Sequence, residues 1–206
     1  SAWMRSLLHL ADRAHDLSGG LFDPTAQALW QALARGGDVP AARATVGWSR
    51  VGRGDGVTLA PGQALTLNGI AQGFATDLVR DRLSDLGATR ALVDIGEQAA
   101  IGGPFRLGLV DPAAGYVGQR TLQNCAVATS SPGALRLAGG ASHIIAPDGR
   151  APLWSTVSVG ADRAALADAL STAAVFLTGD ELAALKRRAQ LPRIVAVAPN
   201  GDVRSA

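Results

Sequence analysis

The sequence predicts an α+β fold, a single mixed domain with largely antiparallel or mixed sheets and packed helices. Segments with helical apolar periodicity alternate with short apolar strand patterns, no repeat or linker interrupts the chain, and 48% of the 206 residues are hydrophobic. A chain of this length can bury a substantial core. We therefore expect one domain that spans residues 1–206.

Apolar residues at helical spacing predict helices over 3–17, 26–34, 70–86, 164–177 and 181–189. Glycines mark several ends, since Gly19 and Gly20 follow the first segment and Gly87 follows the third. Pro24 stands near the first turn of the second helix, where its missing N–H costs nothing.

Short apolar or alternating runs predict strands over 91–95, 105–110, 125–129, 143–145 and 155–159. A terminal hairpin is expected from residues 194–197 and Val203, which flank a turn at 199–202. Residues 35–64 are rich in Gly and Pro, which predicts loops with short extended pieces such as 57–59. Within this stretch Gly52, Gly54 and Gly56 have the wrong spacing for a dinucleotide-binding loop, so a Gly-rich turn is expected.

Composition excludes several classes of protein. Cys125 is the only cysteine, which rules out a disulfide scaffold and a Cys-rich zinc site. Charged residues make up 17% of a largely apolar chain, so it is not a disordered one. The net charge is only +2 and aromatic residues are 4%, which argues against nucleic acid as a partner. No apolar run is long enough for a transmembrane segment.

The first candidate site lies on the predicted helix 164–177. Asp168 and Thr172 are four residues apart among Ala, Leu, Val and Phe, so they share one helix face. A carboxylate and a hydroxyl at this spacing offer two hard oxygen ligands, which suit Mg²⁺. The alternative is an Asp and a Thr on a solvated helix face.

The second candidate is His143, which lies between a Gly-Gly pair and a Pro-Asp-Gly turn. A histidine at the mouth of such a loop can act as an acid or a base near neutral pH. The alternative is a histidine packed in a strand. The other histidines, His9 and His15, lie six residues apart on a predicted helix, and we expect them on a solvated surface rather than at a metal.

Six ordered motifs carry a resemblance to a known family. They are GLFDPT at 20–25, LTLNGIAQGFATD at 65–77, VDIGE at 93–97, ATS at 128–130, HII-x-P at 143–147 and ADALSTA at 167–173. Together they resemble the FAD:protein FMN transferase family, the ApbE-like flavin transferases, over nearly the whole chain. Each motif alone is unspecific, whereas their order and spacing are specific.

The resemblance implies an enzyme that binds FAD with Mg²⁺ and splits the FAD pyrophosphate. It would release AMP and attach FMN to a Thr or Ser hydroxyl of a target flavoprotein. Two alternatives remain at this point: a FAD pyrophosphatase that gives FMN and AMP, and a non-catalytic FAD-binding remnant. Family members are usually exported, so the resemblance also implies a periplasmic or exported protein, with a cytoplasmic location as the alternative.

The resemblance assigns roles by motif position. Asp168 and Thr172 match metal ligands, Gly69 matches a position whose carbonyl completes the metal site, and His143 matches the base for the attacking hydroxyl. The positions that match FAD contacts are Leu21, Phe22, Asp23, Thr66, Gln72 and Ile144.

The chain departs from the family pattern at four positions. Thr66 and Ala146 stand where the pattern has Asp, Gln72 stands where it has Lys, and Gly96-Glu97 replaces a Gly-Gly pair. Family members also carry a segment before the point where this chain begins, and it contributes to the flavin pocket. We therefore expect a domain that lacks this N-terminal part.

Overall fold

The computed structural model describes residues 1–54 and 56–206. Its helices are α1 (Ala2–Ser18), α2 (Gln27–Arg35), α3 (Val39–Ala44), the 3-10 turn η1 (Trp48–Arg50), α4 (Ala71–Asp85), α5 (Ala164–Ala174) and α6 (Gly179–Ala189). Its strands are β1 (Gly52–Arg53), β2 (Val57–Thr58), β3 (Ala91–Asp94), β4 (Gln98–Ile101), β5 (Phe105–Asp111), β6 (Gly115–Leu122), β7 (Ala126–Ser130), β8 (Thr156–Ala161), β9 (Arg193–Val197) and β10 (Val203–Ser205).

The main sheet joins strands from the middle and the end of the chain in the order β10-β9-β8-β7-β4-β3. Each neighbouring pair in it is antiparallel. The hairpin β5–β6 forms a second sheet, and β1–β2 forms a small third one. These antiparallel sheets and packed helices confirm the predicted α+β class.

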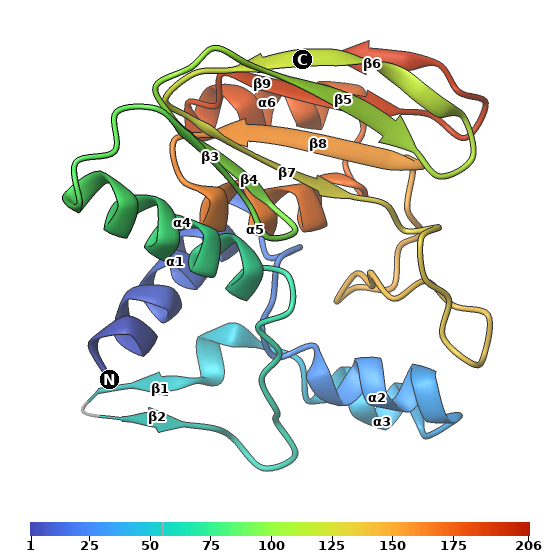
Figure 1. Ribbon diagram of the computed structural model, residues 1–206. Coiled ribbons are helices and arrows are strands. Elements are labelled where there is room, and N and C mark those ends of the chain that lie inside the picture. Colours follow the sequence, from blue (N-terminus) through green and yellow to red (C-terminus); the bar gives the residue numbers. More distant parts are fainter. Residues whose placement is uncertain (55) are drawn as a thin grey trace.

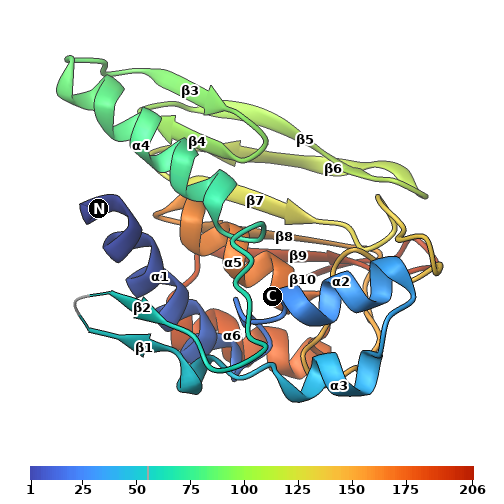
Figure 2. The ribbon, with the colours of Figure 1, turned by 90° about the horizontal axis from the view of Figure 1, so that it is seen from below.

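The molecule has three layers. Figure 1 shows the β5–β6 hairpin above the main sheet and helices α1, α4 and α5 below it. Side chains alternate between the two faces of a strand. On β7, Val127 therefore packs toward Leu122 of the hairpin, while Ala128 joins the core on the helix side. The view from below in Figure 2 shows α2 and α3 at one side of this helix layer.

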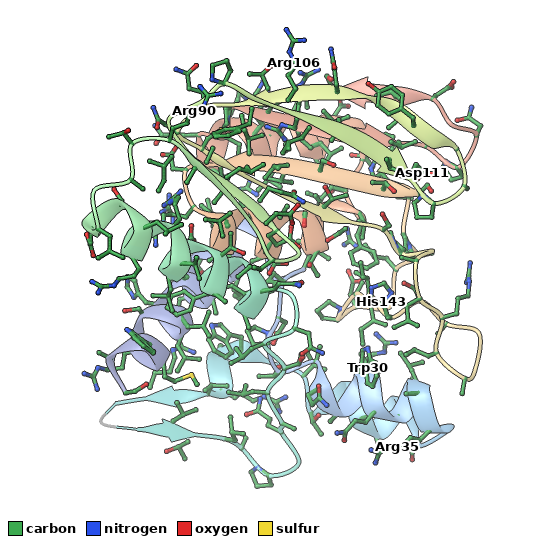
Figure 3. The ribbon with its side chains drawn as sticks, in the orientation of Figure 1. Trp30, Arg35, Arg90, Arg106, Asp111 and His143 are labelled. Carbon is green, nitrogen blue, oxygen red and sulfur yellow. The ribbon has the colours of Figure 1, made fainter. Side chains whose placement is uncertain are left out.

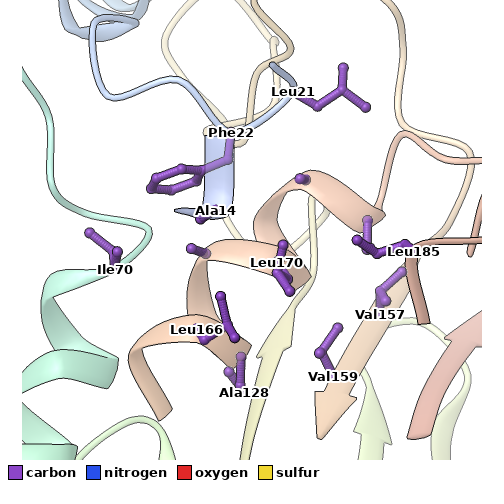
Figure 4. Packing of buried hydrophobic residues seen from close by; sticks show 14 of the residues in the cluster. Ala14, Leu21, Phe22, Ile70, Ala128, Val157, Val159, Leu166, Leu170 and Leu185 are labelled. Carbon is purple, nitrogen blue, oxygen red and sulfur yellow. The ribbon is translucent and has the colours of Figure 1, made fainter. Parts of the chain in front are cut away.

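Helix α5 lies at the centre of the helix layer. Every residue of α5 except Thr172 is buried, because the helix packs against β7, β8, α4 and α1 at once. A helix surrounded on all sides is expected to be apolar around its whole circumference, as the Ala and Leu residues of α5 are. Figure 4 shows Leu166 and Leu170 of α5 packed between Ile70 and the β8 residues Val157 and Val159.

Most predicted elements are confirmed within a few residues, and the exceptions have local causes. Residues 143–145 form no strand, because the Ile144 N–H bonds to the nearby Ser142 hydroxyl rather than to a neighbouring strand. Helix α5 ends at Ala174, earlier than predicted, because the next N–H groups, of Phe176 and Leu177, bond to carbonyls three residues back rather than four. No sequence pattern predicted α3, β4 or β6.

Among the described residues, no helix combines the length and hydrophobicity that crossing a membrane requires.

Candidate functional site

The predicted site residues come together around one cavity of about 410 Å³. This volume lies in the usual range for small-molecule sites. Its walls come from the loop after α1, the start of α4, the β3–β4 turn, the end of β7, the 131–147 loop and helix α5. The lining includes every residue predicted from sequence: Leu21, Phe22, Asp23, Thr66, Gly69, Gln72, His143, Ile144, Asp168 and Thr172.

Asp168 enters the cavity from the buried helix α5. Asp168 is only 6% exposed, so the alternative that it lies on a solvated helix face is wrong. The Gly73 N–H donates to its Oδ2 at 3.1 Å. Burial raises the pKa of Asp168 to about 7, although the Gly73 hydrogen bond opposes this shift. Thr172, one turn later, is half-buried and lines the same cavity.

Two glycines allow α4 and the loop before it to approach α5 closely. A Cβ on Gly69 would lie 2.9 Å from the Thr172 hydroxyl oxygen, and one on Gly73 would lie 2.4 Å from the Ala164 carbonyl oxygen. Asp77 of α4 then accepts hydrogen bonds from the N–H groups of Ala164 and Ala165, both at 2.9 Å. It thereby satisfies free donors at the start of α5. Gly69, Asp168 and Thr172 are thus held in register.

Glu97 also lines the cavity, although no sequence pattern pointed to it as a site residue. It lies in the turn between β3 and β4, is 7% exposed and lines the cavity. The Thr129 N–H donates to its Oε2 at 3.2 Å. Burial and the neighbouring Asp168 charge raise the pKa of Glu97 to about 8. The sequence feature that could have pointed to Glu97 is its position directly after Gly96, in the turn that follows the strand at 91–94.

His143 lies in the loop that borders the cavity, not in a strand as predicted. Its Nδ1 lies 3.0 Å from the Leu135 carbonyl oxygen, which can only accept a hydrogen bond. Nδ1 therefore carries the proton in the neutral ring, and Nε2 is free to accept one. Trp30 of α2 donates from Nε1 to the His143 carbonyl at 3.0 Å. Figure 3 shows Trp30 and His143 approaching each other from α2 and the loop.

The loop 21–25 carries Leu21, Phe22 and Asp23 into the cavity. The Ser18 hydroxyl accepts from the Phe22 N–H at 2.9 Å, and His15 Nδ1 contacts the Phe22 carbonyl at 2.9 Å. The expectation of a solvated His15 is therefore wrong, since its ring anchors this loop to α1. His9 is exposed, as predicted.

Asp23 and Gln72 both have protein partners of their own. Asp23 accepts from the Thr25 N–H at 2.8 Å and from the Trp48 N–H at 3.1 Å, so it holds the loop to η1. The Gln72 amide donates to the Ile95 carbonyl at 3.0 Å, which ties α4 to the β3–β4 turn. Both residues therefore shape the wall of the cavity.

The cavity offers both oxygen ligands for a divalent cation and apolar contacts for a ligand. Among the described residues no group of three or more His, Cys, Asp or Glu side chains could hold a metal. A cation at Asp168 would therefore need other oxygen ligands, such as the Thr172 hydroxyl and backbone carbonyls. Such hard oxygen ligands suit Mg²⁺, which keeps several waters or phosphate oxygens in its shell. The apolar lining includes Leu21, Phe22, Trp30, Leu135, Ile144 and Ile145.

Comparison with known proteins relates the chain to one family. The model of the ApbE family matches residues 1–196. The fold is similar to the ApbE protein of Thermotoga maritima, with a TM-score of 0.86 and 25% identity over 98% of this chain and 75% of that one. It is also similar to the flavinyl transferase ApbE of Pseudomonas stutzeri, with a TM-score of 0.82 and 28% identity over 98% of this chain and 71% of that one.

The flavin transferase ApbE of Vibrio cholerae shares the fold, with a TM-score of 0.78 and 24% identity over 100% of this chain and 74% of that one. No curated protein sequence matches the chain.

Proposed function

Because the chain belongs to the ApbE family, we propose that it is a flavin transferase that moves FMN from FAD to a target flavoprotein. The acceptor is a Thr or Ser hydroxyl, and the second product is AMP. Two similar solved structures are named flavinyl or flavin transferases. The observation that carries the proposal is the buried Asp168 beside Thr172 and Gly69, in a cavity that His143 also borders.

The chain's own residues fit a Mg²⁺ ion at Asp168. Asp168 is only 6% exposed and lies near a second buried carboxylate, that of Glu97. Ionising a carboxyl group in such surroundings is costly unless a cation is nearby. Asp168, the Thr172 hydroxyl and the Gly69 carbonyl would hold the ion. When bound, Mg²⁺ neutralises the charge that develops on the phosphoryl oxygens of FAD.

His143 acts as the general base in the proposed reaction. Its free Nε2 accepts the proton of the acceptor hydroxyl, whose oxygen forms a bond to the phosphorus of the FMN half of FAD. The bond from that phosphorus to the bridging oxygen breaks, and AMP leaves with both bonding electrons. The Leu135 carbonyl fixes the ring through Nδ1, and stabilises the imidazolium that forms.

The remaining lining residues suit FAD as the substrate. Leu21, Phe22 and Ile144 offer apolar contacts for an aromatic ring system, and Asp23, Thr66 and Gln72 line the same cavity. By resemblance to its family, we also propose an exported, periplasmic location.

Product analysis separates this function from its alternatives. The protein is incubated with FAD, Mg²⁺ and a flavoprotein domain that carries an acceptor Thr or Ser. AMP release together with covalent flavin on the acceptor supports the transferase. AMP without labelled acceptor supports the pyrophosphatase, and tight FAD binding without AMP supports a binding protein.

The variant Asp168→Ala tests the metal site within the same assay. It removes an anionic ligand and leaves the Thr172 hydroxyl, which alone holds a divalent ion poorly, so Mg²⁺-dependent turnover should be abolished. Thr172→Val removes one neutral ligand and keeps the shape, so its loss should be smaller. Normal AMP release by Asp168→Ala would show that the metal site has been misplaced.

A further inference from the structure

We propose that Glu97 supplies a second carboxylate ligand to the divalent cation held by Asp168. This inference rests on the proposed function and extends it, because the family pattern has glycine where this chain has Glu97. Glu97 is therefore assigned from the structure alone.

Glu97 and Asp168 reach the same cavity from different layers. Glu97 comes from the β3–β4 turn at the edge of the main sheet, and Asp168 comes from the central helix α5. Both are more than nine-tenths buried. Two carboxylates that converge from separate elements can bind opposite sides of one cation, whereas neighbours on one helix face would approach it from the same side.

One of the two carboxylate oxygens of Glu97 forms a hydrogen bond that fixes the side chain. Its Oε2 accepts from the Thr129 N–H, and its backbone carbonyl accepts from the Thr76 hydroxyl at 3.4 Å. The hydrogen bonds of the described residues give the second carboxylate oxygen, Oε1, no protein partner. It is therefore free to ligate a cation without loss of the bond that fixes the side chain.

One turn of α4 positions both acids. The Gly73 N–H bonds to Asp168, and the adjacent Gln72 amide bonds to the Ile95 carbonyl in the turn that carries Glu97. Gly96 completes this arrangement, because at φ 109° a Cβ would lie 1.9 Å from the Gln72 amide nitrogen. Gln72 and Gly96 thus fix the distance between the turn and α4, and with it the separation of the two carboxylates.

The charge balance of the cavity calls for a cation at this point. Among the described residues, the lining contains no Lys or Arg, and neither Glu97 nor Asp168 forms an ion pair. Two buried carboxylates without a positive partner repel each other and lose their hydration. A divalent cation between them removes both costs, and a higher ligand charge raises its affinity.

Direct metal titration tests the proposal without substrate. Mn²⁺, whose free form gives an EPR signal, is titrated into the full chain in the absence of FAD. Glu97→Gln keeps an oxygen that can accept from Thr129 but removes the charge, so Mn²⁺ affinity should fall about tenfold or more. Asp85→Asn removes one charge at an exposed position on α4 outside the cavity, and its affinity should match the wild type.

Thermal unfolding with and without Mg²⁺ separates ligation from a structural role. Glu97→Gln should melt at the same or a higher temperature than the wild type in metal-free buffer, since it relieves repulsion with Asp168. The rise in melting temperature on adding Mg²⁺ should shrink. A lower metal-free melting temperature together with an unchanged Mn²⁺ affinity would overturn the proposal.

The failure of this inference is distinguishable from failure of the proposed function. If Asp168→Asn loses Mn²⁺ binding while Glu97→Gln retains it, Glu97 is not a ligand and the Asp168 site stands. If neither variant changes Mn²⁺ binding, the metal site of the proposed function is wrong as well. Should Glu97→Gln not fold, Glu97→Ala decides, because an unchanged affinity without the carboxylate would also overturn the proposal.

Discussion

At the scale of single residues, the chemistry of the cavity depends on what surrounds each side chain. His143 shows this most clearly, because the Leu135 carbonyl at 3.0 Å selects the tautomer and leaves Nε2 as the acceptor. The carboxylates of Glu97 and Asp168 likewise owe their raised pKa values first to burial. Residue type alone reveals none of these properties.

Replacing His143 by alanine should slow transfer to the acceptor hydroxyl by roughly 10²–10⁴-fold, the usual contribution of a positioned acid–base group. FAD affinity should change much less, because Ile144 and the α4 region still line the cavity. Single-turnover rate and FAD affinity are measured on the same sample.

His9→Ala is the matched control, because His9 is exposed on α1 and outside the cavity. Its transfer rate should equal that of the wild type. Equal losses of rate and FAD affinity in His143→Ala, in step with a lower melting temperature, would instead identify His143 as a structural residue.

At the scale of elements, the site depends on the contact between α4 and α5. Gly73 permits this contact, and Asp77 caps the start of α5 from the neighbouring helix. Asp81 of α4 also pairs with Arg163, with oxygen and nitrogen 2.8 Å apart. The contact sets where Asp168 lies relative to Gly69.

Gly73→Ala should destabilise the protein and weaken metal binding together. The added Cβ would lie 2.4 Å from a backbone carbonyl, so α4 and α5 must separate, and overpacking of this kind costs about 1–3 kcal/mol or more. Separation also breaks the Gly73 N–H bond to Asp168. Chemical denaturation and Mn²⁺ titration measure the two effects.

Gly133→Ala serves as the control, since a Cβ at Gly133 meets nothing within 4 Å. It should leave both the free energy of unfolding and Mn²⁺ affinity close to the wild type. A Gly73→Ala variant as stable as this control would show that the helices can move apart at little cost.

The sequence predicted elements well where local periodicity is strong. Helices α1, α2, α4 and α6 have clear apolar faces or glycine ends, and their bounds came out nearly right. Strand β4 was missed because Gln-Ala-Ala-Ile has little strand character, and it forms by pairing with β3 and β7. In the sequence, residues 143–145 resemble a strand because two isoleucines follow each other. In the structure Ile144 is buried, but it belongs to a loop that packs against the core.

The candidate site was predictable only in part, for the same reason. Motif positions predicted Asp168, Thr172 and His143 as site residues, and the fold brings all three to one cavity. Glu97 departs from the family pattern, and its neighbour Asp168 is far away in the chain. Only the fold brings the β3–β4 turn to α5, so sequence patterns alone could not pair the two acids.

At the scale of the whole molecule, stability depends on how the β5–β6 hairpin is joined to the main sheet. Asp111 at the end of β5 is 1% exposed and accepts from the hydroxyls of Ser155 at 2.5 Å and Thr156 at 2.7 Å. It also accepts from the N–H groups of Ala113 and Ala114. One carboxylate thus connects the hairpin turn to the start of β8.

This connection predicts how stability depends on pH. Burial of Asp111 favours its neutral form, but the four hydrogen bonds outweigh burial and lower its pKa to about 2. The folded pKa is below the unfolded value of 3.8, so the unfolded state binds the proton more readily. The contribution is therefore complete above about pH 4 and is lost as pH falls toward 2. Its size is on the order of 1–2 kcal/mol.

Asp111→Asn should lower the free energy of unfolding at pH 7, and the difference from the wild type should narrow as the pH is lowered from 4 to 2. Denaturant unfolding at a series of pH values measures the difference in free energy of unfolding between the variant and the wild type. Glu97 and Asp168 have raised pKa values, so their contributions to stability change with pH in the opposite direction. Both proteins contain these two residues, so their contributions cancel in the difference. Asp85→Asn, at an exposed position on α4, should track the wild type throughout. If the difference in free energy of unfolding between Asp111→Asn and the wild type stays constant down to pH 2, the negative charge of Asp111 does not stabilise the contact between the hairpin and the sheet.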